Sequence, residues 1–194
     1  MGPDRQPARI LLVAIFLFFF LPIVGAWLLN VYAPDWRPFG TLNHGTLVQP
    51  ARPVSATRLQ HIDGTAMDPD YLSERWTLVH LLEGDCGRSC IDALARSRQV
   101  HRALGDDMHR VQILLVRAAP ADTRPAELPS GVAFAVADGD WLASFTDTDA
   151  VAGRDAGIYL VDPQGYLMMG YPQDVDRRAL LADLERLLKI SKMG

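Results

Sequence analysis

Cys86 and Cys90 are the only cysteines in this sequence, and they are spaced as i and i+4. They lie in the polar segment 83–90, EGDCGRSC, between an apolar run at 76–82 and residues with apolar positions at helical spacing. In the first turn of a helix such side chains lie one above the other, so two sulfurs can form a disulfide or share a metal ion. The helix N-terminus favours the thiolate that both reactions need. The pair therefore indicates thiol–disulfide chemistry or binding of a soft metal, Cu(I) before zinc.

Two plainer interpretations of the pair remain open, a structural disulfide and two inert thiols. A disulfide that closes so short a loop removes little entropy from the unfolded chain, so it would stabilise the fold little. The pair also follows a buried strand, at the edge where the sites of open α/β sheets collect. Both observations favour a functional role for Cys86 and Cys90.

The surrounding elements alternate between strand and helix patterns. Three apolar runs have the length of strands: 76–82, 111–116 and 132–136. Two segments carry apolar residues at helical spacing: 90–104 and 174–190. The turn sequence Asp-Pro-Gln-Gly at 162–165 joins 158–161 to 166–169 as a hairpin. A β-α-β unit followed by a hairpin and a closing helix predicts an α/β fold, with one mixed sheet flanked by helices.

Residues 10–31 form an apolar segment without a charged side chain. As a helix this segment would span ~33 Å, enough to cross a hydrocarbon core of about 30 Å. Trp27, Tyr32 and Trp36 lie at its far end, where aromatic side chains favour the membrane interface. A cleavable signal peptide is the alternative, but its apolar region would be shorter and would end at a small-residue site that is absent here. The segment predicts a single uncleaved transmembrane helix.

The positive-inside rule gives the expected orientation, because Arg5 and Arg9 precede the helix. The rest of the chain would then lie outside the cytoplasm, on the periplasmic side of the inner (cytoplasmic) membrane in a bacterium, where disulfides persist. We expect four regions: a cytoplasmic N-terminus at 1–9, the transmembrane helix at 10–31, a Pro- and Gly-containing tether at 32–57 with a short strand at 46–49, and a folded domain at 58–194.

The overall charge is mildly acidic, −4 from 23 acidic and 19 basic residues. Proteins that bind nucleic acid usually present a basic face, so we expect no nucleic-acid partner. The sequence contains no hydrolase or transferase signature, and the only enzymatic activity it indicates is thiol–disulfide oxidoreduction.

Two stretches of the sequence resemble the Sco/SenC family: WTLVHLLEGDCGRSC at 76–90 and IYLVDPQGYL at 158–167. The resemblance extends over roughly 59–188 and implies a thioredoxin-like fold for the domain. It also implies a role in cytochrome c oxidase assembly, with copper as cargo and with oxidase subunits or other assembly factors as partners. Family members bind copper through both motif cysteines, which match Cys86 and Cys90, and through a distant histidine.

That histidine has no counterpart in this sequence, because Arg154 stands at the equivalent position and no histidine follows His109. If Arg154 faces the cysteines, its charge would stabilise a thiolate and oppose a bound metal cation, which favours thiol–disulfide chemistry. The alternative for Arg154 is an ordinary exposed loop arginine.

Substitute copper ligands have plainer interpretations as well. His80 is a weak candidate, because its position inside the strand at 76–82 is more typical of a core histidine. We expect the remaining candidates to lie on the tether, in strand packing or on the solvated surface: His44, Met168, Met169, His101 and His109.

Three hypotheses for the function follow. The first is a membrane-anchored, Sco-like accessory factor in oxidase assembly that acts through the Cys86–Cys90 dithiol, by thiol reduction or by Cu(I) handling. The second is a general membrane-anchored thiol–disulfide oxidoreductase. The third is a non-catalytic scaffold or binding protein on a thioredoxin-like fold.

Overall fold

The computed structural model describes residues 6–32, 43–82, 84–119, 125, 128–146 and 156–191. The chain divides into two compact units, Met1–Leu42 and Asn43–Gly194.

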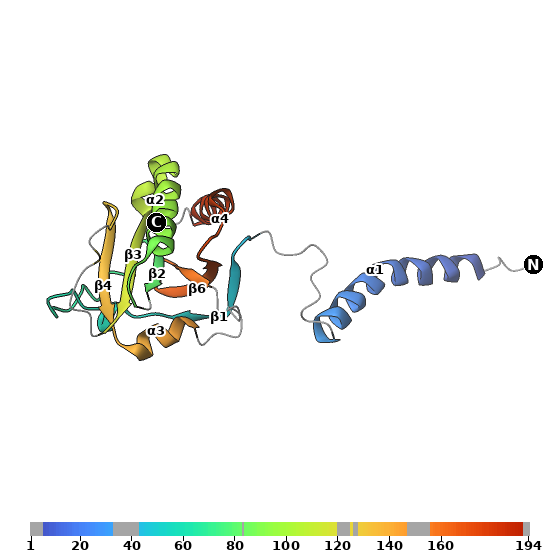
Figure 1. The fold of residues 1–194 in the computed structure, drawn as a ribbon. Coiled ribbons are helices and arrows are strands. Elements are labelled where there is room, and N and C mark those ends of the chain that lie inside the picture. The colour runs from blue at the N-terminus through green and yellow to red at the C-terminus, as the bar shows by residue number, and fades with distance from the viewer. Residues whose placement is uncertain are drawn as a thin grey trace, which may run out of the picture. The chain divides into compact units, whose positions relative to one another are not determined.

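The first unit contains one helix, α1, at Gln6–Tyr32 (Figure 1). Its stretch Arg9–Tyr32 has 24 residues and includes an 18-residue window with a mean hydropathy of 2.7, so it is long and apolar enough to cross a membrane. Its apolar side chains are exposed rather than packed against protein. The helix forms where the sequence predicted one, over 10–31.

The second unit is built on a six-stranded sheet with the order β1-β6-β5-β2-β3-β4. The strands have these bounds: β1 Thr46–Pro53, β2 Trp76–Leu82, β3 Val111–Ala118, β4 Val132–Ala137, β5 Ala156–Val161 and β6 Tyr166–Pro172. Strands β2, β3 and β4 are parallel, whereas β5, β6 and β1 pair antiparallel to their neighbours. The sheet is therefore mixed, as predicted. Because parallel strands end at the same edge, the C-terminal ends of β2 and β3 lie side by side, with Leu82 opposite Arg117.

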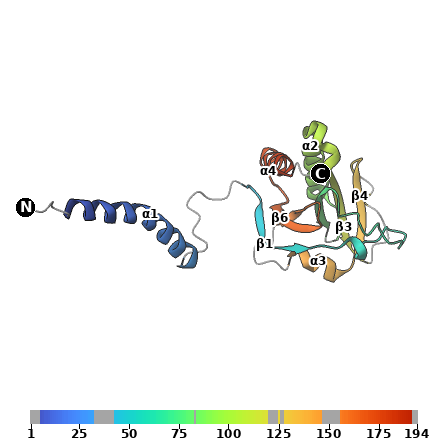
Figure 2. The ribbon, with the colours of Figure 1, turned by 180° about the vertical axis from the view of Figure 1, so that it is seen from behind.

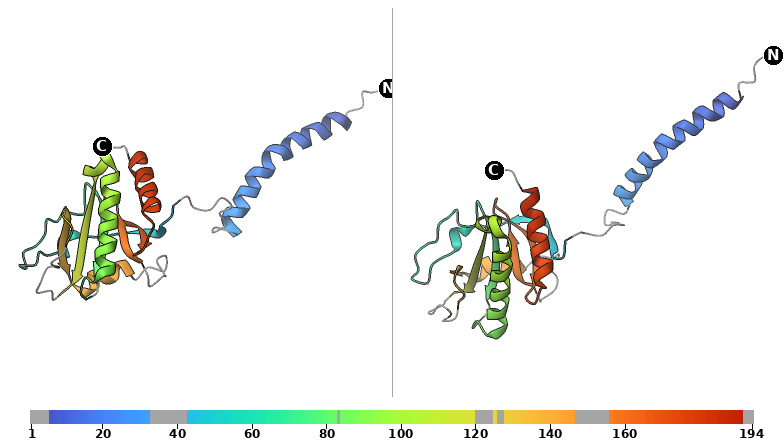
Figure 3. Two further views of the ribbon diagram at one scale, coloured as in Figure 1. Left: turned by 45° about the horizontal axis from the view of Figure 1, so that its top comes forward. Right: turned by 90° about the horizontal axis from the view of Figure 1, so that it is seen from above.

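Helices cover both faces of the sheet (Figures 1 and 2). On one face α2, Arg88–Ala103, lies beside α4, Arg177–Ile190, as both views of Figure 3 show. Their leucines, such as Leu94 and Leu184, pack on Leu78 of the central strand. On the other face lies α3, Gly139–Thr146. Because β2 is buried on both faces, its sequence is an almost continuous apolar run.

Two short 3-10 helices complete the unit: η1 at Ala56–Arg58 and η2 at Gly105–Arg110. Helix α3 has only 8 residues and was not expected from the sequence. Its Phe145 is fully buried and packs edge-on against Tyr159 of β5. The sequence pattern of α3 is too short to indicate a helix, and the contact between Phe145 and Tyr159 holds it on the sheet.

Strand β1 lies within the segment that the sequence assigned to a tether at 32–57, where a short strand was expected at 46–49, and it extends to Pro53. It pairs antiparallel with β6, with Thr46 opposite Gly170 and Arg52 opposite Leu167. The folded unit therefore begins at Asn43, earlier than the boundary expected at 58. The strand pattern is weak because β1 is an edge strand in which only Val48 is buried.

Candidate functional site

Cys86 and Cys90 form a disulfide, with their Cα atoms 5.3 Å apart. Helix α2 begins at Arg88 and Gly87 is its N-cap, so Cys86 lies in the loop just before the helix and Cys90 lies in its first turn. The loop follows β2 directly. The pair thus lies at the edge of the sheet where the parallel strands end, as the sequence predicted.

The two sulfurs differ in accessibility. Cys90 is 7% exposed and belongs to the core between the sheet and the α2/α4 layer, whereas Cys86 is half-buried and packs against that core from outside. A partner molecule can therefore reach Cys86 but not Cys90. This division suits thiol–disulfide exchange in which the accessible sulfur attacks and the buried sulfur resolves the mixed disulfide.

The start of α2 has no side-chain cap. Gly87 makes no capping hydrogen bond, and its own N–H donates to the carbonyl of Asp85 at 2.9 Å. The uncapped N–H groups and the helix dipole favour negative charge next to Cys86, which is where a thiolate would form on reduction.

Arg117 is a residue of the site that sequence reasoning missed. It lies near the end of β3, opposite Leu82 of β2, and its Nη2 lies 3.2 Å from Oδ1 of Asp85. Asp85 is fully exposed and directly precedes Cys86. The signal was available, because Arg117 follows the apolar run at 111–116 and parallel strands end at the same edge.

Two glycines leave open space around Cys86. Gly84 has φ +84°, a left-handed conformation that glycine adopts most readily. Gly87 has an ordinary φ, and a Cβ added there would meet nothing within 4 Å. The fold does not need glycine at 87 for space, and the bare backbone beside Cys86 lets another chain approach the sulfur closely.

His80 is a core histidine in this fold. It is 3% exposed, and its Nε2 lies 3.0 Å from Oγ of Ser97 on α2. Burial, with a smaller contribution from the charge of Arg96, lowers the pKa of His80 to about 3. Ser97 lies seven residues after Cys90, about 10 Å along the helix. The hydrogen bond to Ser97 therefore holds His80 within the core, away from the disulfide.

His44 is held at the start of β1 by Asp183 of α4. Asp183 accepts hydrogen bonds from the backbone N–H groups of His44 and Gly45 at 2.8 and 3.0 Å, and its other oxygen lies 3.0 Å from His44 Nδ1. The hydroxyl of Tyr171 donates to the same carboxylate at 3.2 Å. Burial, with Asp183 beside it, raises the pKa of Tyr171 well above its usual range. Asp183 thus fixes the point where the chain enters the second unit.

The other candidate ligands have local roles. Met169 is buried and accepts a hydrogen bond from Tyr171 at 3.6 Å, and Met168 packs on the same core. The rings of His101 and His109 lie close to backbone carbonyls, at 2.8 and 2.7 Å. Arg154, the expected thiolate stabiliser, lies outside the described residues.

Within the described ranges, no group of three or more His, Cys, Asp or Glu side chains could hold a metal ion. After reduction, Cys86 and Cys90 would offer two soft sulfur ligands, which suit Cu(I). The described site therefore holds one disulfide, which on reduction would supply a dithiol.

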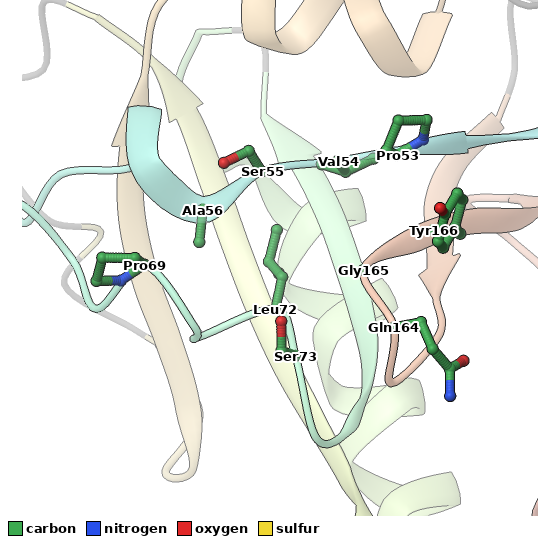
Figure 4. Close-up of a pocket in the computed structure, with 10 residues that line it drawn as sticks. All are labelled: Pro53, Val54, Ser55, Ala56, Pro69, Leu72, Ser73, Gln164, Gly165 and Tyr166. Atoms are coloured by element: carbon green, nitrogen blue, oxygen red, sulfur yellow. The ribbon is translucent and has the colours of Figure 1, made fainter.

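A separate cavity of about 370 Å³ lies at the opposite end of β2 (Figure 4). It is lined by residues of three segments, 53–56, 69–73 and 164–166, including Val54, Leu72 and Tyr166. The turn follows β5 where Val161 is paired with Thr77, at the beginning of β2. The cavity is thus remote from the disulfide loop, which follows the end of β2.

Residues 76–191, more than half of the chain, match the model of a family described as the transmembrane-like, thioredoxin-like, C-terminal domain. No curated protein matches the chain.

Solved structures of Sco proteins share the fold. The solution structure of apo Sco1 from Thermus thermophilus has 17% identity and a TM-score of 0.58, over 78% of this chain and 99% of that one. Yeast Sco1 with copper bound has 16% identity and a TM-score of 0.54, over 77% and 95%. BsSco, described as a cytochrome c oxidase assembly protein with a disulfide switch, has 16% identity and a TM-score of 0.52, over 78% and 98%. At these identities the likeness establishes the Sco-like, thioredoxin-like fold that the sequence implied.

Proposed function

Because this chain belongs to the family of transmembrane-like, thioredoxin-like C-terminal domains, we propose that it is a membrane-anchored thiol–disulfide protein that assists respiratory oxidase assembly. The observation that carries the proposal is the Cys86–Cys90 disulfide, with one accessible and one buried sulfur at the start of α2.

The chemistry is a two-electron exchange in which no atom is lost. In the reduced protein the Cys86 thiolate attacks a partner disulfide, forms a mixed disulfide and releases one partner thiolate. Cys90 then attacks Cys86, which releases the second partner thiol and restores the intramolecular disulfide. A dithiol donor must reduce the pair again before the next cycle.

The Sco-like fold supports a role in oxidase assembly. BsSco, which shares this fold, is described as an assembly protein with a disulfide switch. By analogy, the substrates would be the cysteines of an oxidase subunit or of another assembly factor. Reduction would prepare those cysteines to receive metal.

Cu(I) handling is the second candidate, because yeast Sco1 binds copper on the same fold and two sulfurs are present here. Copper would be cargo held by Cys86 and Cys90 with a third donor. We place it second because His80, the histidine nearest in sequence to the pair, is hydrogen-bonded to Ser97 in the core.

We further propose that α1 anchors the protein with the disulfide domain outside the cytoplasm. The support is the apolar stretch Arg9–Tyr32 and the arginines that precede it. A membrane-impermeant maleimide should label the reduced cysteines in intact spheroplasts. Labelling that requires lysis would contradict this orientation.

The test of function is a redox titration of the reconstituted full chain against glutathione. We expect one two-electron transition above about −300 mV, the range of exchanging rather than structural disulfides. A potential below about −300 mV, without exchange with glutathione, would indicate that the disulfide is structural. A Cys86→Ser, Cys90→Ser variant should fail to support oxidase maturation in the source organism. Full maturation with this variant would favour the scaffold hypothesis instead.

Titration of the reduced chain with Cu(I) under anaerobic conditions separates the two chemical candidates. Tight binding of one copper, lost in the double variant, together with no disulfide reductase activity, would replace thiol reduction by copper handling.

A further inference from the structure

Charge is divided unequally between the two sides of the second unit. Helices α2 and α4 together carry eight Arg or Lys residues and three Asp or Glu. The rest of the described second unit carries five Arg or Lys and twelve Asp or Glu. A protein with a net charge of −4 thus has one basic layer, formed by α2 and α4 on the same face of the sheet (Figure 3).

Most of the basic side chains of this layer are exposed. Six of them are exposed, against two exposed acidic residues, Asp92 and Glu185: Arg88, Arg102, Arg177, Arg178, Arg186 and Lys189. Among the described residues, Arg102, Arg178 and Lys189 form no ion pair. The third acidic residue of the layer, Asp183, is buried and is hydrogen-bonded to the backbone of His44 and Gly45. It therefore offsets little of the outward positive charge.

The same layer receives the chain from the N-terminal unit. His44 and Gly45, the residues before β1, are fixed on α4 through Asp183. If α1 is a membrane anchor, the second unit remains attached at a lipid surface, where anionic headgroups would complement the positive charge of the layer.

We infer that the α2/α4 layer binds anionic phospholipid headgroups. Each exposed Arg or Lys near an anionic membrane surface adds to the electrostatic attraction, which falls off within a Debye length. Six exposed cations are enough to orient a tethered domain. Arg88 belongs to this layer and lies two residues from Cys86, so headgroup binding would present the disulfide beside the membrane surface to partners that are themselves membrane proteins. This inference depends on the anchor proposed above.

The test uses the full chain in nanodiscs of phosphatidylcholine, with or without phosphatidylglycerol that carries a photoreactive headgroup. After irradiation, peptide mapping should find the lipid on α2 and α4 and not on α3. High salt should reduce this labelling by at least about threefold, because the attraction is screened.

Two matched variants separate layer-specific binding from general charge. Arg178→Glu with Lys189→Glu should reduce labelling at least about threefold, whereas Arg52→Glu with Arg75→Glu, outside the layer, should change it little. The inference would be overturned if both faces were labelled equally or if both variants lost labelling equally. It would also be overturned if the layer were protected from chemical labelling only by an added acidic protein. A chain that does not insert into nanodiscs would instead contradict the proposed anchor.

Discussion

Arg117 and Asp85 form an ion pair, with Nη2 and Oδ1 3.2 Å apart, directly beside the sulfur that a partner can reach. In the oxidised protein Cys86 is uncharged, and Arg117 offsets the charge of the Asp85 carboxylate. Reduction adds a thiolate next to that carboxylate. The Arg117–Asp85 ion pair therefore influences how stable the Cys86 thiolate is in the reduced site.

Replacing Arg117 and replacing Asp85 should shift the equilibrium between the disulfide and the dithiol in opposite directions. Arg117→Gln removes a cation that stabilises the thiolate, so the equilibrium with glutathione should move about threefold toward the disulfide. Asp85→Asn removes a repulsive anion and should move it about threefold toward the dithiol. Glutathione titrations measure both shifts. The double variant should return close to wild type, and shifts of the same sign would indicate general distortion of the loop.

Exchange of one cysteine at a time should reveal their roles. With Cys90→Ser, the accessible Cys86 should form stable mixed disulfides with glutathione or a partner, because no second sulfur resolves them. With Cys86→Ser, the buried Cys90 should react at least about tenfold more slowly with iodoacetamide. Non-reducing gels and mass spectrometry measure both outcomes. Equal reactivity of the two variants would rule out the proposed division of labour.

His80 should make the protein less stable in acid. Its pKa is about 3 in the folded state and about 6.5 when unfolded, so below pH 6.5 the unfolded chain binds a proton that the folded chain does not. Stability should therefore fall as the pH drops from about 6.5 toward 3, by up to about 1.4 kcal/mol per pH unit. Denaturant unfolding of the detergent-solubilised chain at several pH values measures this slope. His80→Gln should flatten it, and Ser97→Ala, which keeps the imidazole, should not.

Asp183→Ala should detach the beginning of β1. The change leaves the N–H groups of His44 and Gly45 without their acceptor, so the unfolding free energy should fall by about 3 kcal/mol. Tyr171→Phe removes only one donor to the same carboxylate and should cost about 1 kcal/mol. Unfolding curves give the energies, and hydrogen exchange at 44–48 reports the detachment. Unchanged exchange in Asp183→Ala would show that the pairing of β1 with β6 suffices.

The sequence by itself determined the features that depend on neighbouring residues. The apolar run of β2 predicts a strand buried on both faces, and the Asp-Pro-Gln-Gly turn predicts the hairpin of β5 and β6. The spacing of Cys86 and Cys90, which flank the beginning of α2, predicts that their sulfurs can meet. In each case the interacting groups lie within one element or one turn, so local backbone geometry is sufficient.

Only the tertiary structure decided the relations between distant segments. Edge strand β1 buries little, and its place in the sheet depends on β6, about 120 residues later. Arg117 meets Asp85 because two strands end at one edge, and Asp183 meets His44 because α4 packs over the start of β1. Polar and edge residues carry no apolar periodicity of their own. Their partners, and hence the electrostatics of the site and of the basic layer, are fixed only when the sheet and its helices assemble.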